Sequence, residues 1–479
     1  MVKYLSLLIF IASCILAGPP SRAEQPRERP GERSISEKLD HSLDADGMLW
    51  GVEIGDPGQQ NNKNAVNNTL KTKYVKYRLR DASFTDDGES FISSGCLPNL
   101  NQCFAKIDLD SIVSTFKSNG WSMIPMFSHG APVPAMTTTD IDHYVNFVDW
   151  FVSKYKNDAD IKYIELNNDP LRWWNGGKEQ LLDANNKIYD RIKAKYPDIK
   201  MGTPGFEYWL DDADDQGTQW IAAMVDYFLD AKNNAKFDFW AFHGYPTAAG
   251  GAKAFYFYPP TKTAVSNKYA GIPGISEIRQ KMDANGWQNR LIIDTEHVNA
   301  VHQLTAGISS QEDKLVSAYT IQELVLKKTL KYKNKFVLDG ILPLKIRSRG
   351  SQAENRFGSL NSDGSLTQTV EAVGLFWSKL NEYNYSSRIS GEFDNEHKVW
   401  VEKFISGNKE LYIFFKPFKY QIGLPLQLDN EILNYTLSLG KKPSKVTVTD
   451  INGNTSDTAP DSVLTLKAVN SPQFLEVEY

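Results

Sequence analysis

The sequence is poor in the residues and motifs that mark several large classes of enzyme. It has 3 cysteines and 7 histidines in 479 residues, without an HExxH pair, which argues against a zinc hydrolase. It has no GxSxG segment of the kind that presents a nucleophilic serine. The first apolar run, GVEIGDPG, leads into asparagine-rich residues that read as a loop, with no GxGxxG or GxxxxGK phosphate cradle. We therefore expect no metal ion and no cofactor.

Charge of one sign is not concentrated anywhere along the chain. The net charge is −5 and there is no dense stripe of lysine and arginine, so nucleic acid is not an expected partner. Beyond the N-terminus, no run approaches the roughly 18 apolar residues of a membrane span. A hydrophobic content of 41% and a charged content of 23% are ordinary for a globular protein, and the length allows two or three domains.

The N-terminus has the pattern of an export signal. Lys3 precedes the apolar stretch YLSLLIFIASCILAG, and small residues lie just before Glu24. We predict a signal peptide over 1–23 and a secreted or periplasmic protein. Lipoprotein processing at Cys14 is the alternative, although the chain stays apolar beyond that cysteine. The polar, Pro/Arg-rich residues 24–46 are predicted to form a linker or N-terminal arm.

Export would leave two cysteines, Cys96 and Cys103, in the segment GCLPNLNQC. In an oxidising compartment we expect a disulfide that closes this small loop. The spacing lacks the further cysteine or histidine ligands of a zinc site.

Strand-like and helix-like stretches alternate through the middle of the chain. Amphipathic stretches with helical spacing separate the apolar runs, for example 140–155, 178–195 and 311–330. The spacing of the runs leaves room for a crossover helix each time. This pattern predicts a (β/α)8 TIM barrel, an α/β fold, over 47–384. The eight apolar runs are 48–54, 73–79, 121–127, 161–167, 199–204, 237–243, 290–296 and 337–344.

The pattern changes after about residue 388. Seven short and often alternating apolar segments follow without a helical stretch, separated by turn residues such as Asn452–Gly453. This is typical of antiparallel sheets. We predict a smaller β-sandwich domain over 388–479.

Two carboxylates stand at the ends of two of the apolar runs. Asp169 ends YIELNNDP and Glu296 ends LIIDTE, where strand alternation would put Glu296 on the same face as Asp294. Catalytic groups of a barrel lie just past its strands, and a facing pair of carboxylates is the equipment for cleaving a glycosidic bond. The alternative for Glu296 is a cap on the next helix, and for Asp169 an Asx turn before Pro170.

Four segments resemble motifs of clan A glycoside hydrolases. ELNNDP (165–170) is similar to their strand-four NEP motif, and DTEH (294–297) to their strand-seven nucleophile motif. FDFWAFHGYP (237–246) resembles the strand-six His-x-Tyr segment, and 357–377 the passage into their last helix. A barrel followed by a β-sandwich is also the arrangement in families 39 and 30.

The resemblance implies roles for individual residues. Glu296 would be the nucleophile, Asp169 the acid/base, and Asn168 a hydrogen-bond partner of the sugar 2-hydroxyl. His243 and Tyr245 would line the same subsite, although His243 could instead be a core histidine with satisfied hydrogen bonds. By position alone, Arg78 or Arg80 in the second run would orient Glu296.

The family pattern has glutamate where this chain has Asp169. One methylene less draws the carboxyl back by about 1.5 Å. A separation of about 5.5 Å, which suits retention, then approaches the roughly 6.5 Å at which inversion begins. Retention, inversion and failed proton delivery all stay open, and Glu207 is a possible substitute acid. The aromatic residue that the clan has in strand eight is absent from 340–350.

Further residues after the strands are candidates for substrate contacts. Lys345, just after the last run, would suit a substrate with a carboxylate, unless it belongs to a solvated cationic loop. Trp173 is a candidate platform for stacking on a sugar ring, unless it packs against the barrel. His129, past the third run, could reach the sugar or stabilise a loop.

We therefore expect an exported, retaining glycoside hydrolase that acts on a β-linked polysaccharide or glycoconjugate, which could be acidic. A catalytically inactive, carbohydrate-binding pseudoglycosidase is the main alternative, and a structural envelope or matrix protein a weaker one. The sugar, the linkage, endo or exo action and the oligomeric state are left open by the sequence.

Overall fold

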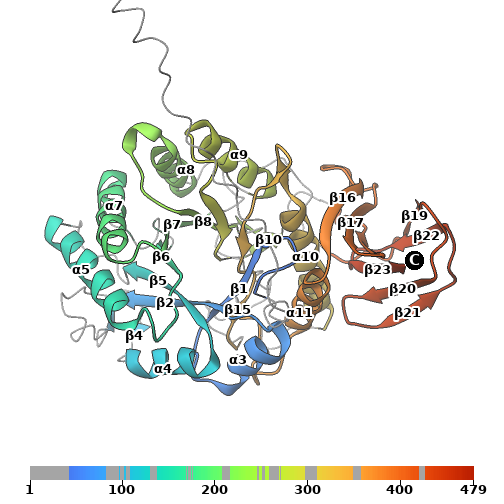
Figure 1. Cartoon of the computed structure of the whole chain (residues 1–479), viewed down its shortest axis with the longest axis horizontal. Coiled ribbons are helices and arrows are strands. Elements are labelled where there is room, and N and C mark those ends of the chain that lie inside the picture. The colour runs from blue at the N-terminus through green and yellow to red at the C-terminus, as the bar shows by residue number, and fades with distance from the viewer. Residues whose placement is uncertain are drawn as a thin grey trace, which may run out of the picture. The chain divides into compact units, whose positions relative to one another are not determined.

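A closed ring of parallel strands forms the centre of the protein (Figure 1). Within the residues that the structure describes, eight strand positions make up this ring. They are β1 (Leu49–Ile54), β2 (Tyr74–Asp81), β5 (Ser122–His129), β6 (Tyr163–Asn168), β7 (Lys200–Glu207), β8 (Phe239–His243), β11 (Leu291–Asp294) and β14 (Gly340–Ile341). The ring closes where β14 pairs with β1, and the short β15 (Lys345–Ile346) also pairs with β1. The predicted (β/α)8 barrel is confirmed.

The computed structural model does not describe every residue of the chain. It describes 42–81, 96–97, 102–103, 108–129, 137–168, 170, 174, 176–207, 216–244, 247–250, 254–257, 269, 271–296, 310–348, 358–419 and 427–479.

Each predicted apolar run contains one strand of the ring. The runs are almost continuously apolar because both faces of a barrel strand are buried, as in β1, where all six residues are buried. The last run was expected to be one strand, but only β14 lies within it, and β15 follows just after its end, with Pro343 between the two strands. Proline has no N–H to donate to a ladder, which explains the break.

Helices follow the strands in turn. They are α4 (Leu109–Asn119), α5 (Thr138–Tyr155), α7 (Lys178–Lys195), α8 (Gln216–Leu229), α9 (Gly271–Ala284), α10 (Ser310–Thr329) and α11 (Gln368–Leu380). Figure 1 shows α4, α5, α7, α8 and α9 in succession around the strands. As an example of local control, the Asp108 side chain caps the start of α4 by accepting from Ser111 N, and Gly120 ends it with φ 68°.

The prediction of a loop after β1 is wrong. The asparagine-rich segment forms a short helix, α3 (Gln60–Asn64), that continues as a π-helix, η1 (Ala65–Leu70). Asparagine is a poor helix former, so the segment reads as a loop. Burial of Ala65, Val66 and Leu70 outweighs that preference.

The inside of the ring is filled by apolar side chains toward the amino ends of the strands. These side chains come from strands and the segment after β14, not from helices, so they lie within the ring. We call this cluster the apolar layer: Leu49, Ile124, Phe239, Ala241, Ile293 and Leu342. A second and larger core lies between the ring and the helices, and includes Trp50, Phe127 and Trp240.

Two antiparallel sheets follow the barrel, as predicted. One has the order β16 (Asn384–Ser390), β17 (Trp400–Ser406), β18 (Lys409–Phe415), β23 (Gln473–Glu478), β20 (Lys445–Asp450) and β21 (Thr455–Thr458); the other pairs β19 (Leu433–Ser438) with β22 (Val463–Ala468). Val401, Phe414, Leu437 and Leu466 pack between the two sheets. The fully exposed β21 lacks any apolar alternation and was not predicted. The expected strand in YQIGLPLQL lies mostly outside the described residues.

The six-stranded sheet also packs against the barrel. Gln322 of α10 donates to the carbonyl oxygens of Lys416 (3.0 Å) and Asn470 (2.6 Å). Thr329 of the same helix donates to Glu402 Oε1 of β17 at 3.2 Å. The barrel helices and the sandwich therefore share buried polar contacts.

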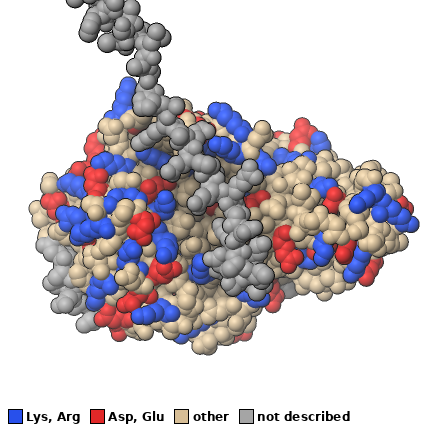
Figure 2. All heavy atoms as spheres, viewed as in Figure 1, with Lys and Arg blue, Asp and Glu red and all other residues tan. Residues whose placement is uncertain are grey.

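Short elements complete the described structure. Two hairpins are β9 (Thr247–Gly250) with β10 (Ala254–Phe257), and β12 (Lys331–Tyr332) with β13 (Lys335–Phe336). A 3-10 turn, η2, spans Ala231–Asn233. Among the helices described, none is both long and apolar enough to cross a membrane. On the face drawn in Figure 2, acidic and basic side chains are interspersed.

Candidate active site

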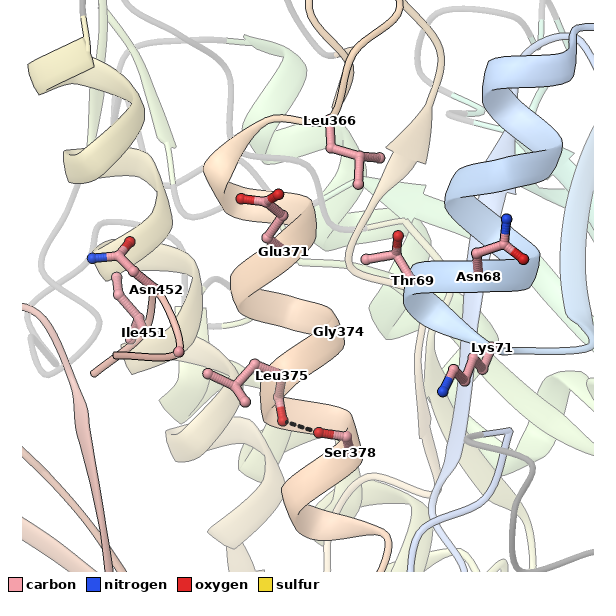
Figure 3. A pocket seen from close by; sticks show the side chains of 11 residues that line it. Asn68, Thr69, Lys71, Leu366, Glu371, Gly374, Leu375, Ser378, Ile451 and Asn452 are labelled. Atoms are coloured by element: carbon pink, nitrogen blue, oxygen red, sulfur yellow. Dashed lines mark hydrogen bonds between the residues drawn. The ribbon is translucent and has the colours of Figure 1, made fainter. Parts of the chain in front are cut away.

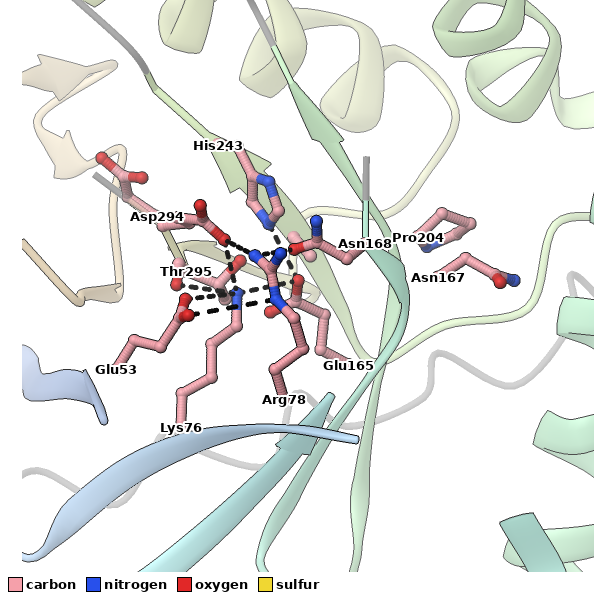
Figure 4. Close-up of polar contacts among 12 residues, drawn as sticks. Glu53, Lys76, Arg78, Glu165, Asn167, Asn168, Pro204, His243, Asp294 and Thr295 are labelled. Atoms are coloured by element: carbon pink, nitrogen blue, oxygen red, sulfur yellow. Dashed lines mark hydrogen bonds and ion pairs between the residues drawn. The ribbon is translucent and has the colours of Figure 1, made fainter. Parts of the chain in front are cut away.

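Charged side chains replace apolar ones inside the ring toward the carboxyl ends of the strands (Figure 4). They are buried, and each has at least one partner of opposite charge, as buried charges require. The carboxyl end of the strands is where barrels carry their catalytic groups. We call this set the charged layer: Glu53, Lys76, Arg78, Glu165, His243, Glu296 and Lys345.

Strand β2 supplies two cations to the charged layer. Lys76 and Arg78 are two residues apart, so both side chains face the inside of the ring. The Lys76 Nζ lies 3.2 Å from Glu165 Oε1 and 3.5 Å from Glu296 Oε2, and its side chain is fully buried. Burial alone would lower the pKa of Lys76, but Glu165, Glu296 and Glu53 raise it above its ordinary value. Lys76 is therefore a cation.

Glu296 turns into the ring just after β11 ends. Asp294 points the other way and forms an ion pair of 2.5 Å with Lys327 of α10. The expectation that Glu296 shares a face with Asp294 is therefore wrong. Strand geometry stops at Asp294, and Thr295 and Glu296 no longer alternate.

Arg78 holds the Glu296 carboxylate. Its Nη2 donates to Glu296 Oε2 at 2.8 Å, which answers which arginine of β2 orients Glu296. Burial by itself raises the pKa of Glu296. The charges of Arg78, Lys345 and Lys76 outweigh burial and hold the pKa well below its usual range. Glu296 is ionised at neutral pH, as a nucleophilic carboxylate has to be.

Asn168 lies beside Glu296. The same Arg78 Nη2 donates to Asn168 Oδ1 at 2.8 Å, so the oxygens of Asn168 and Glu296 are no more than twice 2.8 Å apart. Strict alternation from Glu165 would turn Asn168 outward. Asn167, at a positive φ of 44°, and a register shift between Leu166 and Asn168 bring it inward.

Glu165 and His243 form a buried pair next to Lys76. His243 Nε2 lies 2.8 Å from Glu165 Oε1, and both side chains are inaccessible to water. Burial raises the pKa of Glu165, but Lys76 and His243 outweigh it and lower the pKa below its ordinary value. Gly205 of β7 leaves room for the pair, because a Cβ there would clash with His243 Nε2 and Glu165 Oε1.

Glu53 and Lys345 form the remaining ion pair of the charged layer. The Lys345 Nζ lies 2.6 Å from Glu53 Oε1, and both side chains are buried. Burial lowers the pKa of Lys345 to about 8; Arg78 and Arg347 add to this effect, while Glu53 and Glu296 oppose it. Lys345 thus belongs to the charged layer and not to a solvated loop.

Several predicted site residues lie outside the described part of the chain. They are Asp169, Trp173 and Tyr245, together with the side chains of His129 and Glu207. Trp174, next to Trp173, is buried and donates to the carbonyl oxygen of Gly177 at 3.2 Å.

The cysteine-containing segment is described only in its backbone. β3 (Cys96–Leu97) and β4 (Gln102–Cys103) pair antiparallel, with Cys96 opposite Cys103. The disulfide stays a prediction.

Three members of the charged layer were not predicted from the sequence: Glu53, Lys76 and Glu165. Each carried a visible signal, because each is a charged residue within a run otherwise suited to a buried strand. Lys76 also stands two residues before Arg78, so strand alternation puts both side chains on the same face of β2.

A groove elsewhere on the surface does not contain this chemistry. It lies along α11 and η1, with the turn between β20 and β21 at its side (Figure 3). Its lining residues include Asn68, Lys71, Glu371, Ser378 and Asn452. None of these belongs to the charged layer.

The sequence matches no protein-family model and no curated protein. Solved structures do match the fold. A family 39 glycoside hydrolase from the gut symbiont Bacteroides cellulosilyticus WH2 matches with a TM-score of 0.62 at 15% identity, over 93% of this chain and 82% of that chain. A family 30 subfamily 8 xylanase from Clostridium acetobutylicum matches with a TM-score of 0.53 at 12% identity, over 90% and 96% of the two chains.

A family 44 xyloglucanase from Paenibacillus polymyxa matches with a TM-score of 0.52 at 12% identity, over 89% of this chain and 96% of that chain. At such identities the likeness is one of fold. The resemblance to clan A glycoside hydrolases is thus confirmed in the architecture, a barrel followed by antiparallel sheets.

Proposed function

We propose that the protein is an exported glycoside hydrolase that cleaves β-glycosidic bonds in a polysaccharide or glycoconjugate. Glu296 would act as nucleophile and Asp169 as acid/base, in a retaining mechanism. The observation that carries the proposal is the Glu296 carboxylate, held by Arg78 at 2.8 Å on the inside of the ring at its carboxyl end.

The lowered pKa of Glu296 supports a role as nucleophile and not as general acid. A general acid needs a pKa raised toward the working pH, whereas the surrounding cations lower the pKa of Glu296. The second carboxyl group must therefore bring the proton to the leaving group. Glu165 is a poor candidate because it is fully buried and its pKa is also lowered.

Asp169 is the candidate for the acid because it follows Asn168, which shares the Arg78 donor with Glu296. An ordinary retaining pair holds its carboxyl groups about 5–5.5 Å apart, and an inverting pair about 6.5–9.5 Å apart. A shorter aspartate at 169 fits retention only if the backbone runs closer to Glu296. Retention is the proposal, and inversion is the outcome that a product analysis would reveal.

The substrate is proposed to be a β-linked glycan. Its acidity is a separate question, because Lys345 is already paired with Glu53 at 2.6 Å. Acidic polysaccharides therefore have to be tested as substrates alongside neutral ones. Export through a signal peptide over 1–23 and a Cys96–Cys103 disulfide complete the proposal. The N-terminal residue of the exported protein and a thiol count of the folded protein test these two points.

A catalytically inactive carbohydrate-binding protein is the second candidate, since Asp169 replaces the glutamate of the resembling motif. The test is hydrolysis of a panel of aryl β-glycosides and neutral and acidic polysaccharides, by the wild type and by Glu296→Gln. Turnover by the wild type that Glu296→Gln lacks supports the enzyme. Saccharide binding with equally negligible turnover in both proteins would favour the binding protein, and no binding of any saccharide would favour a structural role.

A further inference from the structure

We infer that Lys76 is a positioning residue, which turns the chain after β11 into the barrel and holds Glu296 in the place from which it attacks. This inference rests on the proposed function of Glu296. It concerns a residue that does not itself need to touch the substrate, because Lys76 is fully buried.

The first observation is where Lys76 binds the chain after β11. Its Nζ donates to the backbone oxygen of Thr295 at 3.2 Å, and it lies 3.5 Å from Glu296 Oε2. These contacts fall at the point where alternation breaks and Glu296 departs from the face of Asp294. A single ammonium group thus binds both the backbone of the turn and the side chain that the turn presents.

The second observation is that Lys76 connects several strands of the ring. Its Nζ also lies 3.2 Å from Glu165 Oε1 of β6 and 3.8 Å from Glu53 Oε2 of β1. Without Lys76, buried carboxylates would face one another, and mutual repulsion raises the pKa of one member of such a set. Lys76 therefore helps to lower the pKa of Glu296 as well as to hold its carboxylate in place.

The groups that face Lys76 come from every side of the charged layer. Glu53 of β1, Arg78 of β2, Glu165 of β6 and Glu296 after β11 act on Lys76 itself, and His243 of β8 and Lys345 of β15 act on Glu296. Arg78 and Lys345 remain when Lys76 is removed. We therefore expect a shifted pKa of Glu296 and not a neutral Glu296 at pH 7.

Lysine suits this position for a geometric reason. An ammonium on an unbranched stem offers three donors to acceptors in different directions, whereas arginine presents a flat fork. The acceptors around Lys76 belong to different strands. A guanidinium group at this position would not form its usual two parallel hydrogen bonds to one carboxylate.

The experiment compares the pH dependence of kcat/KM in the wild type, Lys76→Met and Lys76→Arg. The acid limb of this profile is the range in which kcat/KM falls because Glu296 takes up a proton. In Lys76→Met we expect the acid limb to move to higher pH by about one unit or more, because Glu296 loses a neighbouring opposite charge. We expect kcat to fall about 10²-fold, the scale of a misplaced reacting group, with little change in KM. In Lys76→Arg the charge returns, so the acid limb should move back toward the wild-type position.

Lys328→Met is the matched control. Lys328 is also fully buried and lies 2.6 Å from Asp44 Oδ2, but its partners are outside the charged layer. Both methionine variants should lower the melting temperature, and only Lys76→Met should move the acid limb. An unmoved acid limb and an unchanged kcat in folded Lys76→Met would overturn the inference and leave Lys76 a purely structural residue.

Two further arms keep the inference testable. If Lys76→Met does not fold, Lys76→Gln removes the charge, keeps an N–H donor and carries the same expectation for the acid limb. If the wild type cleaves no glycoside, the proposed function fails. Crystal structures of the wild type and the Lys76 variant then decide positioning: Glu296 displaced from Arg78 supports it, and an unmoved Glu296 contradicts it.

Discussion

The apolar layer and the charged layer lie inside the same ring and are built largely from the same strands. In the apolar layer, side chains such as Ile293 leave water without any polar atom to satisfy, and each stabilises the fold by roughly 1.5–3 kcal/mol. In the charged layer, Lys76 and Glu165 are equally buried, but their desolvation costs free energy that their pairing must offset.

The segment from Ile293 to Glu296, at the end of β11, contains this contrast within four residues. Ile293 belongs to the apolar layer, and Glu296 lies in the charged layer with Arg78. Replacing a buried charged cluster with apolar residues is often neutral or stabilising in proteins. The charged layer is therefore best explained by a role in the reaction, and the apolar layer by its contribution to the stability of the fold. Variants in each layer test that distinction.

The largest effect is expected from Asp169→Ala. Loss of a general acid lowers the rate by about 10²–10⁴-fold, and most for leaving groups that need a proton. Rates on aryl glycosides with leaving groups of rising pKa measure this dependence. Asp169→Glu is the matched variant, because it restores the side-chain length of the resembling motif. Equal losses with good and poor leaving groups would contradict an acid role for Asp169.

Arg78→Met should have the next largest effect on turnover. Arg78 lowers the pKa of Glu296 more than the other cations do, so its loss raises the pKa of that carboxylate. Glu296 then takes up a proton at a higher pH, and the acid limb of kcat/KM moves upward by about one to three units. A pH–rate profile checks this shift. An acid limb identical to that of the wild type would mean that Glu296 does not control it.

Ile293→Ala tests the other layer. Removing a buried isoleucine side chain costs about 2–5 kcal/mol in the free energy of unfolding, measured by urea denaturation. The acid limb of the folded variant should stay where it is in the wild type, because no charge changes. A shifted limb with unchanged stability would reverse the roles assigned to the two layers.

The smallest effect concerns the pH dependence of stability. The pKa of Lys345 is lowered to about 8 from its ordinary 10.5, so the unfolded chain binds more protons between these values. The free energy of unfolding should therefore rise with pH across this window and stay at its lower level below about pH 8. In Lys345→Met this rise should be smaller. Denaturation curves from pH 7 to pH 10.5 that have the same slope in both proteins would contradict the assignment.

The sequence predicted the ring well because a barrel strand is a strong signal. Each of the eight apolar runs holds a strand, and their separation left room for the helices. The helix at 60–70 was not predicted, because its asparagines favour loops and its stability comes from buried contacts. The break at Pro343 was visible in the sequence as a residue without a donor.

The candidate site was predictable in part. The position of Glu296 at the carboxyl end of a strand was visible from sequence, and its direction was not. The direction of Glu296 depends on the irregular turn at Thr295, and the direction of Asn168 depends on a bulge at Asn167; alternation describes neither. Lys76 and Glu165 were visible as charged residues within apolar runs, but their pairing was recognisable only when strands far apart in the chain were brought together.

One measurement tests the central claim most directly, that Glu296 forms the covalent bond to the sugar. An activated 2-deoxy-2-fluoro derivative of the β-glycoside that the wild type cleaves fastest would slow release of a glycosyl-enzyme, so that the adduct accumulates. Mass spectrometry of the digested protein then locates it. If Glu296 is the nucleophile, the adduct lies on the peptide that carries Glu296. An adduct on another carboxylate, or none at all in a protein that cleaves the parent glycoside, would contradict it.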